Sequence, residues 1–372
     1  MRKIAFLTGT RADYGKIKPI INGLIGTGKF EVYIFVTGMH LEKTYGETWK
    51  EIEKDGFANI YKFESSSVFM ERGLAKTVEG FSVFIEILKP DLVFVHGDRP
   101  EALAGAITGS FTNTLVSHIE GGEVSGTIDE LIRHAITKLS HIHFVANEKA
   151  RMRLIQLGEN PQTVFVVGSP DIDIMLSDTL PSLETVRSKY EIPASPYAIA
   201  IFHPVTTEVE GLEEHVFDFV KAMKKSGDPY IVIYPNNDPG AEVVLDVYDK
   251  TLRKDRYFRL FPSIRFEYFL TLLKYAKYIV GNSSVGIREA QVYGIPTVNI
   301  GTRQWNRCLD SSIINVDYGV EEIMKGIEQA KNLELEPSSA FGDGQSVRRI
   351  CEALCQEDIW KVPIQKRFVD VI

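Results

Sequence analysis

Short apolar runs alternate with amphipathic stretches along the whole chain. The apolar runs are nearly continuous, which is typical of strands buried on both faces of a parallel sheet. The intervals between them carry apolar residues at helical spacing. The pattern therefore predicts an α/β fold. In the first half we expect strands at residues 4–7, 32–36, 92–95, 115–118, 142–145 and 164–167.

The alternation weakens around residues 169–195, where prolines stand among polar residues, and it resumes afterwards. We interpret this stretch as the connection between two domains and the entry to the second. The second series of strands is expected at residues 197–202, 231–234, 258–261, 278–280 and 297–300.

Helical spacing occupies the intervals in both halves, so each half is expected to be doubly wound. We expect two Rossmann-like domains, at residues 1–175 and 176–345, that face one another across a cleft. Residues 346–372 are expected to return to the first domain. Helices are expected at residues 17–24, 74–88, 128–139, 216–224, 266–275 and 285–292.

Composition narrows the possible partners. The chain has 372 residues and a formal net charge of −8. Nucleic acid is disfavoured, because its phosphates require clustered Lys and Arg. No apolar run approaches the ~20 residues that cross a bilayer, so we expect no membrane association. The three cysteines, Cys308, Cys351 and Cys355, fit reduced thiols in a cytoplasmic protein.

In doubly wound sheets, ligands bind beyond the carboxyl ends of the strands, so the loops there are the candidates for chemistry. After the first expected strand comes a glycine turn, residues 9–16, that opens a helix and carries Arg11 and Lys16. Such a turn favours an anion. Its spacing differs from that of a dinucleotide fingerprint, which disfavours NAD. A plain turn with solvated charges is the alternative.

Carboxylates follow two neighbouring strands of the first domain. Asp98 and Glu120 each lie two residues after a histidine, with glycines beside them, and Asp129 and Arg133 share one face of the next helix. Close carboxylates shift one another's pKa values, which suits acid–base catalysis. The alternative is that they act as helix caps and salt-bridge partners. A metal site is a further alternative, but the nearby histidines lack tight metal-ligand spacing.

The second domain also carries polar residues after its expected strands. His203 follows one strand, an Asn-rich turn with Asn237 follows the next, and a Gly-Asn-Ser-Ser turn opens a helix. Hydroxyls and backbone N–H groups at such a turn suit a diphosphate, and an arginine suits bidentate phosphate binding. The pattern predicts a nucleotide site that includes Ser283, Ser284, Glu289 and Arg303.

Taken together, these segments resemble the hydrolysing UDP-N-acetylglucosamine 2-epimerases of sialic-acid and capsule synthesis. The resemblance implies the two-domain fold of the B-type glycosyltransferases, with UDP held mainly by the C-terminal domain. It covers nearly the whole chain. The strings that carry it include GTRADYGK, HGDR, HIEGGEVSGTID, FHPVTTE, YPNND, GNSS and GTRQ.

The resemblance also implies roles for individual residues. Asp98, Glu120 and Asp129 correspond to catalytic carboxylates, His203 to the active-site histidine, and Arg133 to a helper in the sugar pocket. The implied UDP ligands are Arg11, Asn237, Ser283, Ser284, Glu289 and Arg303, and Lys16, from the glycine turn, is expected to join them. No metal or other cofactor is implied, and the expected assembly is a homodimer or homotetramer. One departure is Pro100, after the HGDR string.

The reaction that the resemblance implies is anti elimination of UDP from UDP-N-acetylglucosamine, followed by syn addition of water. The products are UDP and N-acetylmannosamine. The sequence does not assign an acid to each step; we favour Asp98 or Asp129 at the sugar proton and Glu120 at the water. Four alternatives remain: a relative acting on a 4-acetamido sugar nucleotide, a non-hydrolysing epimerase, a B-type glycosyltransferase and a non-catalytic nucleotide-binding module.

Overall fold

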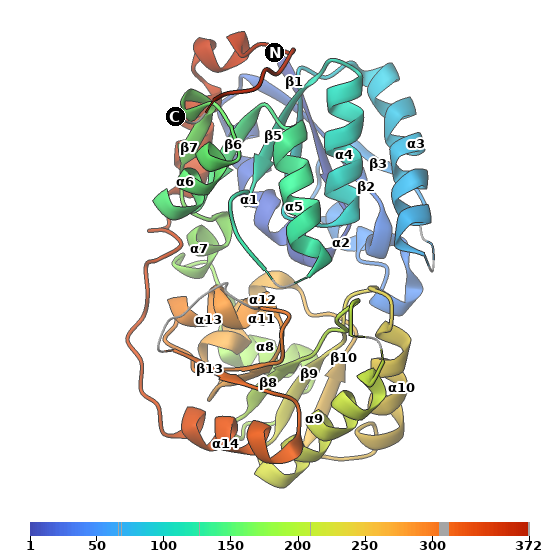
Figure 1. Cartoon of the computed structure of the whole chain (residues 1–372), viewed down its shortest axis with the longest axis vertical. Helices are drawn as coiled ribbons and strands as arrows, with labels where there is room; N and C mark the ends of the chain where they lie inside the picture. Colours follow the sequence, from blue (N-terminus) through green and yellow to red (C-terminus); the bar gives the residue numbers. More distant parts are fainter. Residues whose placement is uncertain (66, 68, 126, 209, 305–311, 371–372) are drawn as a thin grey trace. The chain divides into compact units, whose positions relative to one another are not determined.

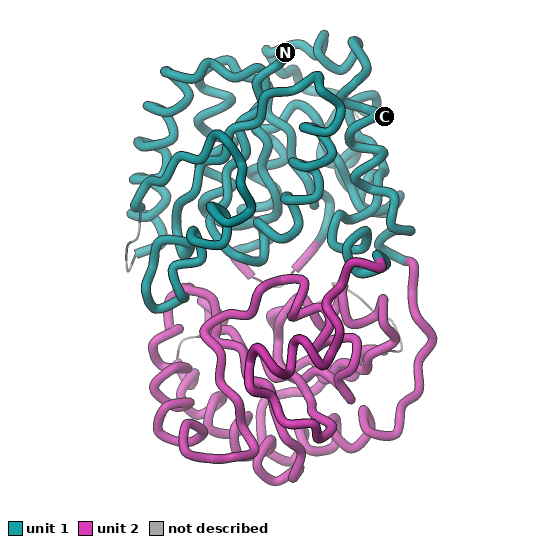
Figure 2. The backbone as a smooth tube through the Cα atoms, turned by 180° about the vertical axis from the view of Figure 1, so that it is seen from behind, with its two compact units in different colours: residues 1–123, 129–177, 340–372 teal, residues 124–128, 178–339 magenta. Residues whose placement is uncertain are grey.

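The computed structural model describes residues 1–65, 67, 69–125, 127–208, 210–304 and 312–370, and it divides into two compact units. Unit 1 comprises Met1–Glu123, Asp129–Ser177 and Ala340–Ile372, and unit 2 comprises Val124–Ile128 and Asp178–Ser339 (Figure 2). The chain passes between the units at Ser177–Asp178, inside the proline-containing stretch. Cys308 lies outside the described residues.

Strands and helices alternate through unit 1, as the hydrophobic pattern predicts. Its last helix, α15, comes from the C-terminal segment of the chain. The elements are β1 (Arg2–Thr8), α1 (Arg11–Gly26), β2 (Phe30–Val36), α2 (Trp49–Lys54), β3 (Ile60–Lys62), α3 (Met70–Leu88), β4 (Leu92–His96), α4 (Pro100–Phe111), β5 (Leu115–Ile119), α5 (Ile128–Leu139), β6 (Ile142–Val145), α6 (Glu148–Gln156), β7 (Val164–Val166), α7 (Pro170–Met175) and α15 (Ser346–Leu354).

The strands of unit 1 form one parallel sheet in the order β3-β2-β1-β4-β5-β6-β7. Every residue of β4, β5 and β6 is buried, because helices cover both faces. Helices α3, α4 and α5 lie on one face (Figure 1), and α1 packs against α15 and α7. The strand order reverses between β1 and β4, so the loops that follow these strands flank the crevice where ligands bind in such sheets.

The C-terminal segment is fixed to unit 1 by a buried polar cluster. The Lys366 ammonium donates to the carbonyl oxygens of Thr137 and Ser140 at the end of α5, at 3.0 and 2.6 Å, and forms an ion pair with Glu159. Burial opposes the charge on Glu159, but hydrogen bonding to His143 and the nearby cations hold the pKa of its carboxyl at about 2. The tail therefore caps the helix that carries Asp129 and Arg133.

Unit 2 repeats the same alternation. Its elements are α8 (Leu183–Tyr190), β8 (Ala198–Ile201), α9 (Leu212–Ser226), β9 (Tyr230–Ile233), α10 (Ala241–Thr251), β10 (Phe258–Phe261), α11 (Phe266–Lys274), β11 (Ile279–Gly281), α12 (Ser284–Ile287), α13 (Glu289–Val292), β12 (Thr297–Ile300), β13 (Ile313–Val316) and α14 (Val320–Lys331).

The sheet of unit 2 is parallel in the order β10-β9-β8-β11-β12-β13. Its core joins the apolar faces of α9, α10 and α14 to the strands, with Phe202 stacked on Phe219. The order reverses between β8 and β11, which places the loops after β8, β11 and β12 at the ligand-binding end. Two parallel sheets with helices between their strands confirm the predicted α/β, doubly wound fold class.

Three features differ from the sequence prediction. Strands β3 and β13 were not predicted; both are short edge strands with exposed or half-exposed residues. The helix expected at residues 285–292 is instead two short helices that meet at Arg288. A physical reason is that the carbonyl oxygen of Gly286 accepts a hydrogen bond from Thr297 Oγ1, at 2.7 Å, in competition with the helical bond.

No helix in the described part of the chain combines the length and apolar character that a bilayer crossing requires.

Candidate functional site

Asp98 and Arg133 form an ion pair in unit 1. Asp98 lies in the turn between β4 and α4, and the guanidinium of Arg133 donates a hydrogen bond to its carboxylate. Arg133 is fully buried, and it also donates to the carbonyl oxygen of Glu123 at 3.3 Å. Burial opposes its charge, but nearby carboxylates, Asp98 first, raise the pKa of Arg133. The arginine therefore holds the Asp98 turn against α5.

Glu120 lies in a second buried cluster, directly after β5. Its Oε2 is 3.0 Å from Nε2 of His96 and 3.8 Å from Nζ of Lys16. Lys16 Nζ is in turn 3.5 Å from Oδ2 of Asp171, on α7, and Asp171 is fully buried. The cluster thus joins two carboxylates, one ammonium and one imidazole in a water-poor environment. Such an arrangement can accept and release a proton.

The backbone at Glu120 has φ of +74°, in the left-handed region that side chains disfavour. Gly122, two residues later, has φ of +77°, and a Cβ atom there would overlap the carbonyl of Ala150. A non-glycine residue in this conformation costs about 1–3 kcal/mol, and such strain gathers at functional positions. The turn therefore holds the Glu120 carboxylate in place at a cost in stability.

Asp129 lies in the first turn of α5, one helical turn before Arg133. Its side chain is half-buried, and its charge contributes to raising the pKa of Arg133. The predicted carboxylates therefore share one electrostatic environment through Arg133, which also responds to Glu120.

His118 connects the turn after β4 to α5. Its Nε2 donates to the carbonyl of Gly97 at 2.8 Å, and Nδ1 is 3.3 Å from Thr137 Oγ1 on α5. Burial lowers the pKa of His118 to about 3, so the ring is neutral at physiological pH. Within the described residues, no three His, Cys, Asp or Glu side chains are arranged to hold a metal ion.

The two cations predicted to bind an anion after β1 have separate partners. Arg11 NH2 is 2.5 Å from Glu51 Oε1, on α2, whereas Lys16 faces Glu120 and Asp171. The turn itself is a capping box, in which Thr10 and Asp13 satisfy one another's backbone N–H groups. The structure thus places Lys16 with the carboxylates of the Glu120 cluster.

In unit 2, His203 is tied to Asn282. The backbone N–H of His203 donates to Asn282 Oδ1 at 2.7 Å, and Asn282 Nδ2 donates to the His203 carbonyl at 2.8 Å. His203 Nδ1 accepts from the backbone N–H of Asn236 at 3.1 Å. The ring is therefore oriented through Nδ1, and the loops after β8, β9 and β11 are joined.

Arg303 lies in the loop after β12 and reaches the same residues. It is buried, and NH1 donates to the carbonyl of Asn282 at 3.4 Å, where Gln304 Nε2 also donates at 2.9 Å. Arg303 NH2 is 3.9 Å from Oδ2 of the buried Asp238. One guanidinium, with Asp238 near it, therefore lies beside the turn after β11, and an arginine is a side chain that suits phosphate binding.

The remaining predicted ligands lie around the turn after β11. Ser283 caps α12 through its side chain, which accepts from the N–H of Val285 at 3.4 Å; Ser284 is the first residue of that helix, and both are half-buried. Glu289 begins α13 and is buried. Asn237 is half-buried in the loop after β9. Because α12 has only four residues, its dipole supports a phosphate less than the sequence predicted.

Glu208 connects three segments of unit 2, and the sequence analysis missed it. Its carboxylate accepts hydrogen bonds from Thr302, beside Arg303, and from Tyr318 Oη at 2.8 Å. The ring of His215 stacks on Tyr318, with centroids 3.7 Å apart. Glu208 stands within the FHPVTTE string, which was a signal, but its partner in the loop after β12 could not be read from the sequence.

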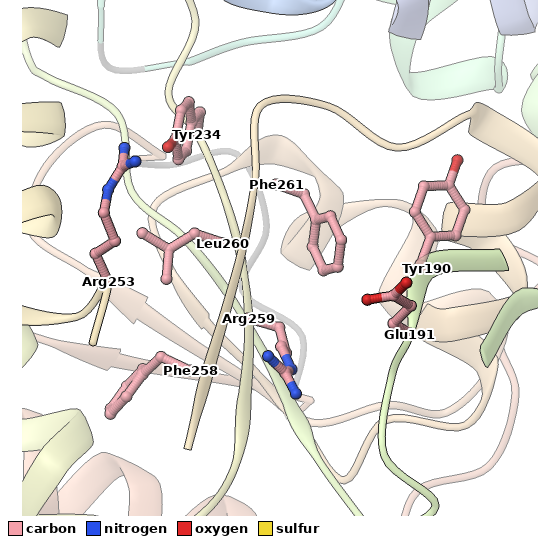
Figure 3. A pocket seen from close by; sticks show the side chains of 8 residues that line it. All are labelled: Tyr190, Glu191, Tyr234, Arg253, Phe258, Arg259, Leu260 and Phe261. Atoms are coloured by element: carbon pink, nitrogen blue, oxygen red, sulfur yellow. The ribbon is translucent and has the colours of Figure 1, made fainter. Parts of the chain in front are cut away.

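A cavity of about 330 Å³ lies along the edge strand β10 (Figure 3). Tyr234 and Arg253 lie on one side of the strand, and Tyr190 and Phe261 on the other. None of the predicted ligands lines this cavity. The predicted residues of unit 2 lie instead in the segments that follow β8, β9, β11 and β12.

Known proteins match this chain along most of its length. A family model described as UDP-N-acetylglucosamine 2-epimerase matches residues 24–355. A protein of Neisseria meningitidis serogroup B named UDP-N-acetylglucosamine 2-epimerase is 46% identical over 377 residues, covering 100% of both chains. One of Legionella pneumophila, named UDP-N,N′-diacetylbacillosamine 2-epimerase (hydrolyzing), is 33% identical and covers 100% of this chain and 98% of its own.

Two further matches add to these. An Escherichia coli protein named polysialic acid biosynthesis protein P7 is 34% identical, covering 88% of this chain and 85% of its own. The crystal structure of Methanocaldococcus jannaschii UDP-GlcNAc 2-epimerase in complex with UDP-GlcNAc and UDP gives a TM-score of 0.83 at 23% identity, covering 95% of this chain and 99% of that one. This likeness establishes the shared fold, and the family match with the full-length relatives shows that the chain belongs to the UDP-N-acetylglucosamine 2-epimerase family.

Proposed function

We propose that the protein is a hydrolysing UDP-N-acetylglucosamine 2-epimerase, which converts UDP-N-acetylglucosamine and water into N-acetylmannosamine and UDP for sialic-acid synthesis. The observation that carries this proposal is the 46% identity, over the full length, to the Neisseria relative named UDP-N-acetylglucosamine 2-epimerase. The polysialic acid relative supports the pathway. The Legionella relative, named as hydrolyzing, supports release of a free sugar.

The proposed first step is elimination of UDP. The proton on C2 of the sugar has no adjacent carbonyl, so it becomes removable only as the C1–O bond to UDP breaks and positive charge grows on the ring. The departing diphosphate gains negative charge and requires fixed donors. Arg303 and the hydroxyls of Ser283 and Ser284 supply them in this proposal. His203, oriented through Asn236 and Asn282, is assigned to the UDP half of the substrate, together with these donors.

Removal of the C2 proton requires a carboxylate that is available to the sugar. The Asp98 carboxylate is engaged by Arg133, whereas Asp129 stands one turn earlier on α5. We therefore assign proton removal to Asp129 and positioning of the sugar to the Asp98–Arg133 pair. Loss of the C2 proton and of UDP leaves a C1=C2 double bond.

The second step adds water across this double bond. A proton returns to C2 on the opposite face, and the water oxygen bonds to C1 and loses its own proton. Glu120 and His96, 3.0 Å apart, form a pair that can deliver one proton and take up another. The sum of the two steps is inversion at C2 and release of both UDP and the free sugar.

Product identification tests the proposal. The protein is incubated with UDP-N-acetylglucosamine, and the products are followed by proton NMR. Free N-acetylmannosamine and UDP in equal amounts are expected. A product that keeps its UDP would identify a non-hydrolysing epimerase, and an unchanged substrate would overturn the proposed reaction.

A second candidate substrate is a UDP sugar with a 4-acetamido group, and the 33% full-length identity to the Legionella relative favours it. The chemistry at C1 and C2 is the same, so the acids described above would serve both substrates. Competing the two substrates in one reaction decides between them: the preferred one has the higher kcat/KM. We expect UDP-N-acetylglucosamine to be preferred.

A further inference from the structure

The cluster around Glu120 contains a buried acid that neither the sequence motifs nor the reaction steps use. Asp171 is fully buried on α7, and its Oδ2 is 3.5 Å from Lys16 Nζ. Lys16 Nζ is also 3.8 Å from Glu120 Oε2. One ammonium therefore lies between two carboxylates, and the side chains of Lys16 and Glu120 are only 10% and 8% exposed.

Lys16 lies close enough to both carboxylates for its positive charge to stabilise each of them. Burial strengthens these interactions, because little water screens them. The negative charge of Asp171 therefore offsets part of the effect by which Lys16 favours ionised Glu120. If Lys16 faced Glu120 alone, the pair would be neutral without a proton, and Glu120 would be a weaker base.

The geometry points to Asp171 as a positioning residue that acts on Glu120 through Lys16: by sharing the ammonium, it leaves Glu120 able to carry a proton during the reaction. This inference rests on the proposed function for its chemical purpose. The electrostatic claim concerns unit 1 alone, and it can be tested without substrate.

Two further groups lie near Glu120. His96, at the end of β4, contacts it at 3.0 Å, and Arg133, on α5, interacts with it electrostatically. Neither group is substituted in Asp171→Asn or Lys16→Met, so both are present in each measurement. Removal of the Asp171 charge should favour ionised Glu120, and removal of the Lys16 charge should disfavour it. The two changes therefore act in opposite directions.

The experiment measures the titration of Glu120 directly. The protein carries ¹³C at its glutamate carboxyls, and the Glu120 resonance is the one missing from the Glu120→Gln spectrum. In Asp171→Asn the pKa of Glu120 should fall by roughly one unit, and in Lys16→Met it should rise by at least about one unit. The low-pH limb of kcat/KM for UDP release should move in the same directions.

Asp173→Asn is the matched control, because Asp173 lies on the same helix but caps α15 through Ser346 and Val347. It should leave the Glu120 titration unchanged. Shifts of the same sign in Asp171→Asn and Lys16→Met, or no shift in Asp171→Asn, would overturn the assignment. If the variants show the expected shifts but the wild-type protein releases no UDP, the proposed function is overturned instead.

Discussion

The guanidinium of Arg133, on α5, donates a hydrogen bond to the carboxylate of Asp98, in the turn after β4. Arg133 has no exposed surface, and Asp98 is 22% exposed. The pair therefore fixes the distance between two segments that both carry predicted catalytic acids. It also explains why a basic residue is tolerated inside the unit.

Asp98→Asn should remove the main partner of a buried cation. We expect a loss of about 3 kcal/mol in the free energy of unfolding, because the remaining charge is less compensated. We also expect a fall in kcat of about 100-fold, because the sugar is no longer held in position. Urea denaturation and UDP release measure the two effects. Glu148→Gln is the control, since its ion pair with Arg151 is exposed and should contribute less than about 1 kcal/mol. Equal effects of the two variants would contradict this account of the pair.

Glu120→Gly and Glu120→Ala should differ in stability although both lose the carboxylate. Alanine keeps the strain of φ +74°, whereas glycine adopts this conformation freely. The glycine variant should be more stable by about 1–2 kcal/mol, and both should lose turnover. Chemical denaturation compares them. If the alanine variant is as stable as the glycine variant, the backbone at Glu120 is not strained.

Arg303→Ala should weaken UDP binding by about 10- to 100-fold, because a charge-assisted contact to phosphate contributes roughly 1.5–3 kcal/mol. Calorimetric titration with UDP measures the Kd. Arg253→Ala is the control: Arg253 lies beside the β10 cavity and pairs with Asp249 on the surface. The Arg253→Ala variant should bind UDP with the same Kd as the wild-type protein. If Arg253→Ala weakens UDP binding and Arg303→Ala does not, the nucleotide binds at the β10 cavity instead.

Stability should fall as the pH falls below about 6.5, because two buried histidines stay neutral when folded. Burial lowers the pKa of His40 to about 4 and that of His118 to about 3. Their stabilising contribution is complete above the unfolded value of 6.5. It is lost as the pH falls towards the folded values, since the unfolded chain binds protons that the folded one excludes.

The limiting slope is about 1.4 kcal/mol per pH unit for each histidine, and the two together should give roughly 2–2.5 kcal/mol per unit between about pH 6 and pH 4, because neither titration is complete across that range. Urea denaturation at several pH values measures it. His118→Asn should remove about half of the slope, whatever its effect on stability at pH 7. If the stability of His118→Asn depends on pH with the wild-type slope, His118 does not stay neutral in the folded protein as proposed.

Much of the fold could be predicted from the hydrophobic pattern. The buried strands β6 and β12 have the predicted bounds, because fully buried parallel strands are continuous apolar runs. The edge strands β3 and β13 escaped prediction because their partly exposed residues weaken that signal, whereas the edge strand β10 was predicted because it keeps the apolar residues Phe258, Leu260 and Phe261. The break at Arg288 depends on a hydrogen bond from Thr297, a residue of the next strand.

The candidate residues could be proposed from the sequence because they follow strands, but their partners could not. The pairing of Lys16 with Asp171 joins α1 to α7, more than a hundred residues apart in the chain. No local pattern distinguishes Asp171 from Asp173, although one faces Lys16 and the other caps α15. The catalytic and UDP-binding roles themselves stay predictions.

Hydrogen exchange at C2 of the sugar tests the central claim most directly. The reaction is run in deuterated water with UDP-N-acetylglucosamine, and the released N-acetylmannosamine is examined by NMR and mass spectrometry. The account predicts one deuterium at C2 in each product molecule, because the proton removed during loss of UDP is replaced from solvent. Released N-acetylmannosamine that retains its original C2 proton would contradict it.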